Sequence, residues 1–404
     1  MTGRGPQRIL YFDTSGRGGG AIVSLRTLVT SLDREEFAPL LVFGDRGNAD
    51  RWGGEEVLEL SYAGLDNFDF FSAGWNVRWL FHALRFVVHF PLDFCRVVLL
   101  LKRTRPALVH LNGGQAATFG LAARLLGVPL VWHVRELVTG NGLGNVLDAV
   151  YQFCAGVIIA PSEAAARRLP RCREKVRIIP NGVADAVALA DEVVALRRNA
   201  GLKEGDFVVL LLGHIVSEEK GYAFLAEVAE KLGRLRNLRF LLAGHYQDAD
   251  APRYHRLLRR AYRLFSGGMG RRAVIVNMWR AEVARGRAYF TGYVDSAAAI
   301  ACSSIVACPN MISEPFGRTV IEAYAMGKPV IASDVPALNE IVKHGVTGWL
   351  VPRDAEAWAR TIETLYLDPE LVAWAGGEAS LAGRTYSAGH HAAQIMDVYR
   401  KVLS

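Results

Sequence analysis

Two glutamates, Glu314 and Glu322, stand in the pattern with the clearest chemical meaning in the sequence. An apolar run precedes them, and the residues between them predict a turn at Gly317 and a helix that begins near Arg318. A helix N-terminus presents backbone N–H groups and a partial positive charge, which suit a phosphate, and glycine lets the backbone approach closely. The two carboxylates are therefore predicted to bind a polyol at each end of a diphosphate. In the purely structural alternative, Glu314 caps the helix and Glu322 is solvated.

This stretch, residues 313–333, resembles the E-x7-E motif of family four of the retaining glycosyltransferases. The resemblance implies the α/β GT-B fold, two doubly wound Rossmann-like domains facing across a cleft, and a nucleoside diphosphate sugar as donor. It implies that Glu314 contacts the transferred sugar as a catalytic residue and that Glu322 holds the ribose. The donor diphosphate is expected at the helix start, beside Phe316, Gly317, Arg318 and Thr319. Residues 327–333 and 340–348 extend the match, and weaker similarity covers nearly the whole chain.

Two further segments resemble parts of that family's site. The glycine-rich residues 16–20 resemble its N-terminal loop near the donor phosphates, which makes Gly18 and Gly19 predicted donor-binding residues, although such turns are often only structural. His133 resembles the histidine that lines the sugar pocket and is predicted to be catalytic, although a lone His after a buried strand is usually structural. Arg135, two residues on, is predicted to supply a cation to the diphosphate.

The stretch 213–221 departs from the family pattern. The family commonly has an Arg directly after the glycine and a Lys seven residues after it, and both neutralise the diphosphate. Lys220 is present and is predicted to act in catalysis, but His214 stands in place of the Arg. A neutral imidazole supplies less charge than a guanidinium and cannot make the same fork. Either His214 is protonated beside phosphate, or Arg135 or Arg318 takes over the missing charge.

The expected reaction breaks the anomeric bond and builds negative charge on the β-phosphate. Lys220, the helix start at Gly317 and an arginine are the groups predicted to stabilise that charge. The resemblance implies retention of the anomeric configuration, attack by the acceptor hydroxyl on the front face, and neither metal nor cofactor. The sugar and base of the donor stay open, because base contacts in this fold come largely from backbone, here near residues 292–295 with Val294.

Short apolar runs separated by helical patterns predict parallel sheets covered on both faces. The runs are expected as strands at residues 8–12, 38–43, 107–111, 129–133, 156–160, 207–212, 238–243, 288–292, 305–309 and 329–332. Their arrangement predicts an acceptor-side domain over residues 1–181 and a donor-side domain over residues 182–385. A C-terminal helix of about residues 386–404 is expected to pack back on the first domain.

Two insertions interrupt this pattern. Residues 75–101 are apolar with interspersed arginines and run into basic residues up to Arg105, and Pro91 predicts two helices there. They form either core helices with a solvated basic rim or an interfacial helix on anionic lipid. The second alternative suggests a lipid-linked or membrane-proximal acceptor; a soluble acceptor stays open. Residues 248–287 form either a helical elaboration or a mobile loop.

Composition sets broader limits. The 404 residues suit two domains, and 47 Lys and Arg against 40 Asp and Glu favour anionic small molecules or a membrane surface over wrapped nucleic acid. Five scattered cysteines show no zinc spacing and predict reduced thiols. Neither a signal peptide nor an apolar run of about 20 residues is evident. We expect a cytoplasmic protein, or one peripheral on the inner face of the cytoplasmic membrane.

Two other functions fit the same fold. One is a GT-B epimerase or hydrolase that acts on a nucleotide sugar without an acceptor, although the order of Glu314, Gly317 and Glu322 fits the transferases better. The other is a catalytically degenerate binding subunit, for which His214 is the hint. Assays of donor hydrolysis with a panel of nucleotide sugars distinguish the three.

Overall fold

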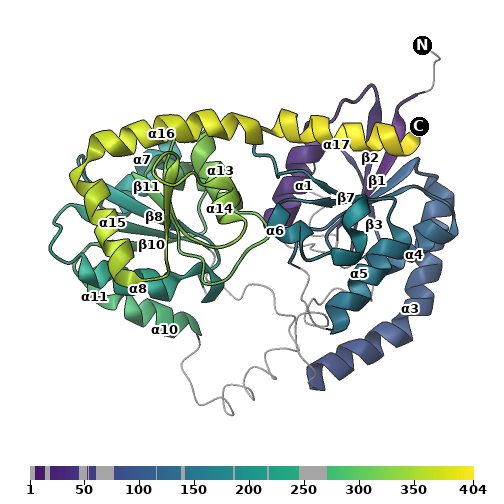
Figure 1. Cartoon of the computed structure of the whole chain (residues 1–404), viewed down its shortest axis with the longest axis horizontal. Helices are drawn as coiled ribbons and strands as arrows, with labels where there is room; N and C mark the ends of the chain where they lie inside the picture. Colours follow the sequence, from purple (N-terminus) through teal and green to yellow (C-terminus); the bar gives the residue numbers. More distant parts are fainter. Residues whose placement is uncertain are drawn as a thin grey trace. The chain divides into compact units, whose positions relative to one another are not determined.

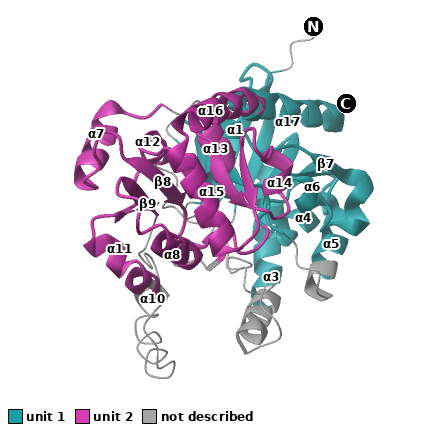
Figure 2. Ribbon diagram, turned by 60° about the vertical axis from the view of Figure 1, so that its left-hand side comes forward, with its two compact units in different colours: residues 1–184, 314–318, 386–404 teal, residues 185–313, 319–385 magenta. Residues whose placement is uncertain are grey.

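The computed structural model describes residues 5–13, 19–44, 52, 54–60, 77–114, 116–137, 142–184, 187–215, 218–244 and 271–404. Contacts group the chain into two compact units, coloured separately in Figure 2. Unit 1 consists of Met1–Ala184, Glu314–Arg318 and Tyr386–Ser404, and unit 2 of Asp185–Ser313 and Thr319–Thr385. Each unit is built on its own parallel sheet with helices on its faces (Figure 1), so the predicted α/β fold class is confirmed.

Unit 1 contains a seven-stranded sheet in the order β3-β2-β1-β4-β5-β6-β7, with all neighbours parallel. The strands are β1 (Gln7–Asp13), β2 (Phe37–Phe43), β3 (Glu56–Glu59), β4 (Leu108–Asn112), β5 (Leu130–His133), β6 (Val157–Ala160) and β7 (Val176–Ile178). The sequence predicts all of these except the two edge strands, β3 and β7. Both are short and mix charged with apolar residues, so neither forms the continuous apolar run of a buried strand.

Alternate side chains of β1 enter two cores on opposite faces of this sheet. Leu10 and Phe12 pack with residues of α3, α4 and α5. Ile9 and Tyr11 pack with residues of α1 and of the C-terminal helix α17. The helices of unit 1 are α1 (Gly20–Thr30), α3 (Val77–Thr104), α4 (Ala117–Leu125), α5 (Gly142–Cys154), α6 (Glu163–Ala166), the 3-10 helix η2 (Pro170–Lys175) and α17 (Ala388–Leu403).

Unit 2 contains a six-stranded parallel sheet in the order β10-β9-β8-β11-β12-β13. Its strands are β8 (Phe207–Leu212), β9 (Leu238–Ala243), β10 (Ala288–Gly292), β11 (Ile305–Cys308), β12 (Val330–Ser333) and β13 (Gly348–Val351). The sequence predicts the first five and misses the edge strand β13. Because β8 pairs with β9 on one side and with β11 on the other, the strand order changes direction at β8.

A large core of unit 2 lies on one face of β8. Phe207, Val209 and Leu211 pack against α8 and α15 in one large cluster. The helices of unit 2 are α7 (Ala190–Asn199), η3 (Glu218–Lys220), α8 (Tyr222–Lys231), α10 (Arg271–Met278), α11 (Arg280–Ala284), α12 (Ser296–Ala301), α13 (Arg318–Ala325), α14 (Leu338–Ile341), α15 (Ala355–Leu367) and α16 (Pro369–Gly383); η4 (Arg384–Tyr386) follows α16.

The first insertion corrects one prediction. Pro91 lies inside a single helix, α3, so the prediction of two helices is wrong. Proline removes one backbone hydrogen bond, at a cost of about 3 kcal/mol in a helix interior. Burial of Val97 and Leu101 in the core anchors the second half of α3 to the sheet and offsets part of that cost. Among the described residues, no helix combines the length and apolarity needed to cross a membrane.

The second insertion, residues 248–287, is partly helical. α10 and α11 occupy its C-terminal part, and Ile275 and Trp279 pack into the core of unit 2. The Trp279 indole N–H donates to the carbonyl of Tyr222 at 2.9 Å. Residues 248–270 lie outside the described residues. The described part therefore fits the alternative of a helical elaboration.

Candidate functional site

The helix predicted after Glu314 is present, because α13 begins at Arg318. Its apolar face, which includes Val320 and Ile321, is buried and fixes the helix against unit 2. Gly317, directly before the helix, has a φ of +105°, a conformation that residues with a side chain rarely adopt. It therefore sets the angle at which the chain enters α13. Of the other predicted residues here, Phe316 is buried and Glu314, Thr319 and Glu322 are half-buried.

The loop before α13 also makes contacts within unit 1, to which Glu314–Arg318 belongs. The carbonyl of Pro315 accepts a hydrogen bond from Ser162 Oγ at 2.6 Å. Arg318 Nη1 donates to Ser24 Oγ at 2.8 Å. Part of the donor capacity of Arg318 is thus used by a protein hydroxyl.

His214 and Lys220 follow β8, the strand next to β11 in the unit 2 sheet. The carboxyl ends of parallel strands meet at one edge, so these residues lie at the same edge of the unit 2 sheet as the residues that directly follow β11, where the strand order changes direction. His214 is exposed and Lys220 half-buried. A Cβ on Gly213 would lie 3.2 Å from Lys220 Cγ, so this glycine leaves room for the lysine stem.

Val294 lies elsewhere in unit 2. It follows β10, the edge strand, which β9 separates from β8. Val294 is half-buried, and the next residue, Asp295, caps α12 by accepting from the N–H groups of Ala297 and Ala298 at 2.9 and 3.2 Å. The sheet therefore does not place Val294 directly beside His214; its predicted contact with the donor base stays a prediction.

In unit 1 the predicted residues follow β1 and β5. Gly19 is the N-cap of α1, with a φ of +135°, so the second predicted glycine of the loop does require an unusual backbone. Gly18 lies outside the described residues. His133 ends β5 and is fully buried, and Arg135 lies two residues beyond it with 8% exposure.

Arg135 is held by three side chains of unit 1. Its Nε donates to Asn112 Oδ1 at 2.5 Å, and its Nη1 donates to Asn181 Oδ1 at 2.5 Å. Its Nη2 donates to His133 Nδ1 at 3.4 Å. The nearby Asp13 accepts from the amide of Asn112. The structure thus brings together two predicted residues, His133 and Arg135, with three that the sequence analysis did not select.

Burial determines the protonation of this cluster. Burial first, and the Arg135 cation second, hold the pKa of His133 well below its usual value, so the ring is neutral at pH 7. Burial also lowers the pKa of Arg135 to about 10, opposed by the carboxylate of Asp13. Burial raises the pKa of Glu136, opposed by backbone N–H groups of Gly114 and Arg135. Arg135 remains the cation of this cluster at neutral pH.

Within the described ranges, no group of three or more His, Cys, Asp or Glu side chains could hold a metal ion. The sequence contains one Asp-x-Asp stretch, at Asp248 and Asp250, which lies outside the described residues. The expectation of a metal-independent reaction therefore depends on the family resemblance alone.

Comparison with known families accounts for both halves of the chain. The model described as Glycosyltransferase Family 4 matches residues 18–187, and the model described as Glycosyl transferases group 1 matches residues 206–368. The chain belongs to this glycosyltransferase family. The predicted family is thereby confirmed, and the matches contain the described site residues of both units.

The names of curated relatives of this family 4 chain refer to different substrates. A phosphatidyl-myo-inositol mannosyltransferase of Mycobacterium tuberculosis is 30% identical over 237 residues, 55% of this chain and 53% of the relative. An alpha-D-kanosaminyltransferase of Streptomyces kanamyceticus is 26% identical over 321 residues, 72% of this chain and 76% of the relative. The chain matches about half the length of the first of these relatives.

Solved structures show the same fold. The HepE protein of Anabaena, solved in complex with UDP, is 20% identical, with a TM-score of 0.73 over 98% of this chain and 100% of that chain. It has also been solved with UDP-glucose. At this identity the likeness shows the fold alone, and it agrees with two Rossmann-like units in this family 4 chain.

Two of the residues that were not predicted, Asp13 and Asn112, share a feature that is visible in the sequence. Asp13 and Asn112 are the last residues of β1 and β4, just as His133 is the last of β5. The three strands are neighbours in the order β1-β4-β5, so polar residues at their carboxyl ends lie at one sheet edge. Comparing the strand-final residues would have found this group in the family 4 chain.

Proposed function

We propose that the chain transfers a sugar from a nucleoside diphosphate sugar to an acceptor hydroxyl, with retention of the anomeric configuration and without a metal ion. Membership of the glycosyltransferase family supports the reaction class. The observation that carries the proposal is the order of Glu314, Gly317 and Glu322 around the start of α13. In the proposal Glu314 contacts the sugar, Glu322 the ribose, and the helix start the diphosphate.

The leaving group requires positive charge. As the anomeric bond breaks, negative charge develops on the β-phosphate, and preorganised donors stabilise it most effectively. Lys220, beside Gly213 at the end of β8, is our candidate for the main cation. The exposed imidazole of His214 can donate a hydrogen bond to the phosphate. Arg318, the first residue of α13, is a further candidate cation at the helix start.

The donor class has independent support. A structural neighbour from Anabaena was solved with UDP and with UDP-glucose, which fits a nucleotide-sugar donor for this chain. We leave the base and sugar open, since contacts with the base near Val294 would come from backbone. A panel of uridine, guanosine and adenosine diphosphate sugars, with release of nucleoside diphosphate as the readout, tests the proposal and identifies the donor.

That panel also separates the alternatives. Transfer to an added acceptor supports the proposed reaction, whereas consumption of the donor equally fast without any acceptor supports an epimerase or hydrolase. Binding of a nucleotide sugar without turnover, measured by calorimetry, supports a degenerate binding subunit. Failure to bind or consume any member of the panel contradicts the proposal.

For the acceptor, we propose a lipid-linked or membrane-proximal molecule that approaches unit 1 from the helices α3, α4 and α5. These helices contact one another in that order. Large apolar side chains on all three are exposed: Val88, Leu92, Leu99, Leu125, Val146 and Phe153. The relative from Mycobacterium tuberculosis is named for phosphatidyl-myo-inositol, which agrees with this class of acceptor.

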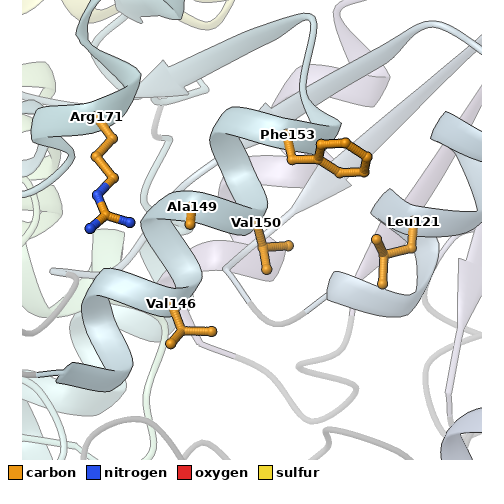
Figure 3. A pocket seen from close by; sticks show the side chains of 6 residues that line it. All are labelled: Leu121, Val146, Ala149, Val150, Phe153 and Arg171. Carbon is orange, nitrogen blue, oxygen red and sulfur yellow. The ribbon is translucent and has the colours of Figure 1, made fainter.

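A hollow of about 410 Å³ lies on this surface. Figure 3 shows apolar side chains along α5 and Leu121 from α4 around it, with Arg171 on the opposite side. The described acidic residue of α5, Asp148, is buried and accepts from the backbone N–H of Arg171 at 3.0 Å. Arg124 lies 5.6 Å from the ring centre of Phe153. Exposed apolar groups beside basic ones suit an anionic lipid surface.

Vesicle flotation tests the acceptor proposal. The full chain is expected to co-float with vesicles containing anionic lipid at low salt, and to do so less at high salt. The double variant Val146→Ser and Phe153→Ser is expected to lose most of this binding. Leu367→Ser, at an exposed leucine of unit 2, is the matched control and should bind normally. Absence of co-flotation by the unmodified protein at low salt contradicts the proposal and favours a soluble acceptor.

A further inference from the structure

The hydrogen bonds around Arg135 determine which nitrogen of His133 carries the proton. A guanidinium can only donate, so the contact between Arg135 Nη2 and His133 Nδ1 requires Nδ1 to be the acceptor. Because the pKa of His133 lies well below its usual value, the ring is neutral and holds one proton. That proton must then lie on Nε2. His133 is therefore a hydrogen-bond donor at Nε2.

Asn112 and Asn181 fix the guanidinium that makes this contact. The Asn112 amide nitrogen donates to Asp13 and to the carbonyl of Ala21, which leaves its Oδ1 toward Arg135 Nε. Asn181 Oδ1 accepts from Nη1 on another side of the same plane. When two nitrogens of a planar guanidinium are held by hydrogen bonds, the position of the third nitrogen is fixed as well. The orientation of Nη2 toward His133 is thus imposed by residues from β4 and from the segment after β7.

The proton on Nε2 has no protein acceptor among the described residues, although the atom is buried. A buried polar group without a partner is destabilising, so such groups are rare unless a ligand or water completes them. The nearby His391 shows that the tautomer is specific: its Nδ1 lies 2.7 Å from the carbonyl of Pro180, which can only accept. The two rings lie 6.1 Å apart, with their protons on different nitrogens.

We propose that Arg135 is a positioning residue, which holds His133 as an Nε2–H donor for a hydroxyl of the transferred sugar. The proposal depends on the proposed function for the identity of that hydroxyl, but the tautomer itself does not. A sugar hydroxyl accepts the hydrogen bond that the protein leaves unmade. Arg135 then acts through His133 and not by direct contact with the diphosphate, which is the role the sequence suggests for it.

The test is Arg135→Lys, with Arg287→Lys as the matched control. Lys keeps the charge, but a single ammonium cannot reach Asn112, Asn181 and His133 together. Arg287 is also a buried arginine; it donates to the carbonyls of Ala229 and Leu232 in unit 2, away from this cluster. Nitrogen NMR of histidine-labelled protein, assigned with His133→Gln, reports the tautomer without any substrate.

In the unmodified chain, we expect a protonated-type signal at Nε2 of His133 and an unprotonated-type signal at Nδ1. Arg135→Lys should give a mixture of the two tautomers and lower kcat by about 10- to 100-fold, with a smaller change in donor KM, in line with losses at groups that orient a functional histidine. Arg287→Lys should lower Tm but leave both the tautomer and kcat unchanged. If Arg135→Lys does not fold, Asn181→Ala removes one anchor and should shift the tautomer partly.

Two results would overturn the inference. One is an Nε2–H tautomer that persists in both Arg135→Lys and Asn181→Ala. The other is a changed tautomer with unchanged kcat, which would limit the role of Arg135 to structure. If the unmodified chain consumes no nucleotide sugar, the proposed function fails, while the NMR result still decides the tautomer.

Discussion

Three buried histidines of unit 1, His110, His133 and His391, lie close together, with ring centres 5.5 Å apart for the first two and 6.1 Å for the last two. Burial lowers the pKa of all three, to about 3 for His391. In the unfolded chain each has a pKa of about 6.5. The unfolded chain therefore binds more protons below that pH, and stability is lost as the pH falls.

This predicts acid sensitivity at mildly acidic pH. The Tm should be nearly constant above pH 7 and fall below about pH 6.5, with each neutral histidine contributing up to about 1.4 kcal/mol per pH unit. His391→Asn keeps a donor toward the carbonyl of Pro180 but cannot be protonated, so its Tm should fall less steeply. Calorimetry between pH 5 and 8 measures both. Equal slopes for the variant and the unmodified chain would contradict the assignment for His391.

At the residue scale the sequence predicts the local backbone structure of the E-x7-E stretch well, because that structure depends on neighbouring residues. The turn at Gly317 and the start of α13 follow from neighbouring residues. The cluster around Arg135 depends on Asp13, Asn112 and Asn181, which are far apart in sequence and meet only after the sheet forms. No local pattern around Asn112 indicates an arginine 23 residues away.

At the scale of elements, the ends of β8 and β9 approach so closely that one position tolerates no side chain. A Cβ on Gly244 would lie 1.7 Å from the carbonyl oxygen of Gly213, far inside any real contact. The side-chain carbons of Lys220 also lie close to Gly213. The packing of these two strand ends therefore positions a predicted site residue.

Gly244→Ala should separate these strand ends. We expect a loss of at least about 2 kcal/mol in stability, as in other overpacked cores, together with weaker binding of nucleotide sugar. Gly377→Ala is the control, because nothing lies within 4 Å of that Cβ and Ala favours a helix. Thermal unfolding and calorimetric titration measure the two effects. A Gly244→Ala protein with unchanged Tm would show that the strand ends are not as tightly packed as described.

The strands that the sequence does not predict share a physical cause. β3, β7 and β13 are edge strands, so each has one neighbour and fewer buried positions than a central strand. Hydrophobic periodicity is the main signal for a strand, and it is weak where burial is partial. The continuity of α3 through Pro91 depends instead on core contacts that the local sequence does not encode.

At the scale of the whole molecule, the chain returns to unit 1 at its C-terminus. Ile395 and Tyr399 of α17 are fully buried in the core that contains β1. The Tyr399 hydroxyl lies 2.7 Å from His110 Nδ1 and donates to the Tyr11 hydroxyl at 3.0 Å. Unit 1 is therefore built from both ends of the chain.

Removal of residues 386–404 should destabilise unit 1 selectively. The truncated chain exposes the core face formed by Ile9 and Tyr11 and loses the apolar contacts of α17, each buried side chain contributing about 1.5–3 kcal/mol. Limited proteolysis with mass spectrometry should show rapid cleavage within residues 1–184 and protection of residues 187–383. His390→Ala, at an exposed position of α17, serves as the control. Equal protection of both units after truncation would contradict this account.

In the proposed function, Glu314 contacts the sugar during its transfer from a nucleotide sugar. The most direct test of this role is release of nucleoside diphosphate by Glu314→Ala, compared with the unmodified chain and with Glu356→Ala, which removes an exposed glutamate of α15 paired with Lys231. We expect a loss of about 10²- to 10³-fold or more in kcat for Glu314→Ala, with Tm unchanged within a few degrees, and no loss of kcat for Glu356→Ala. Near-normal turnover by Glu314→Ala would contradict this role.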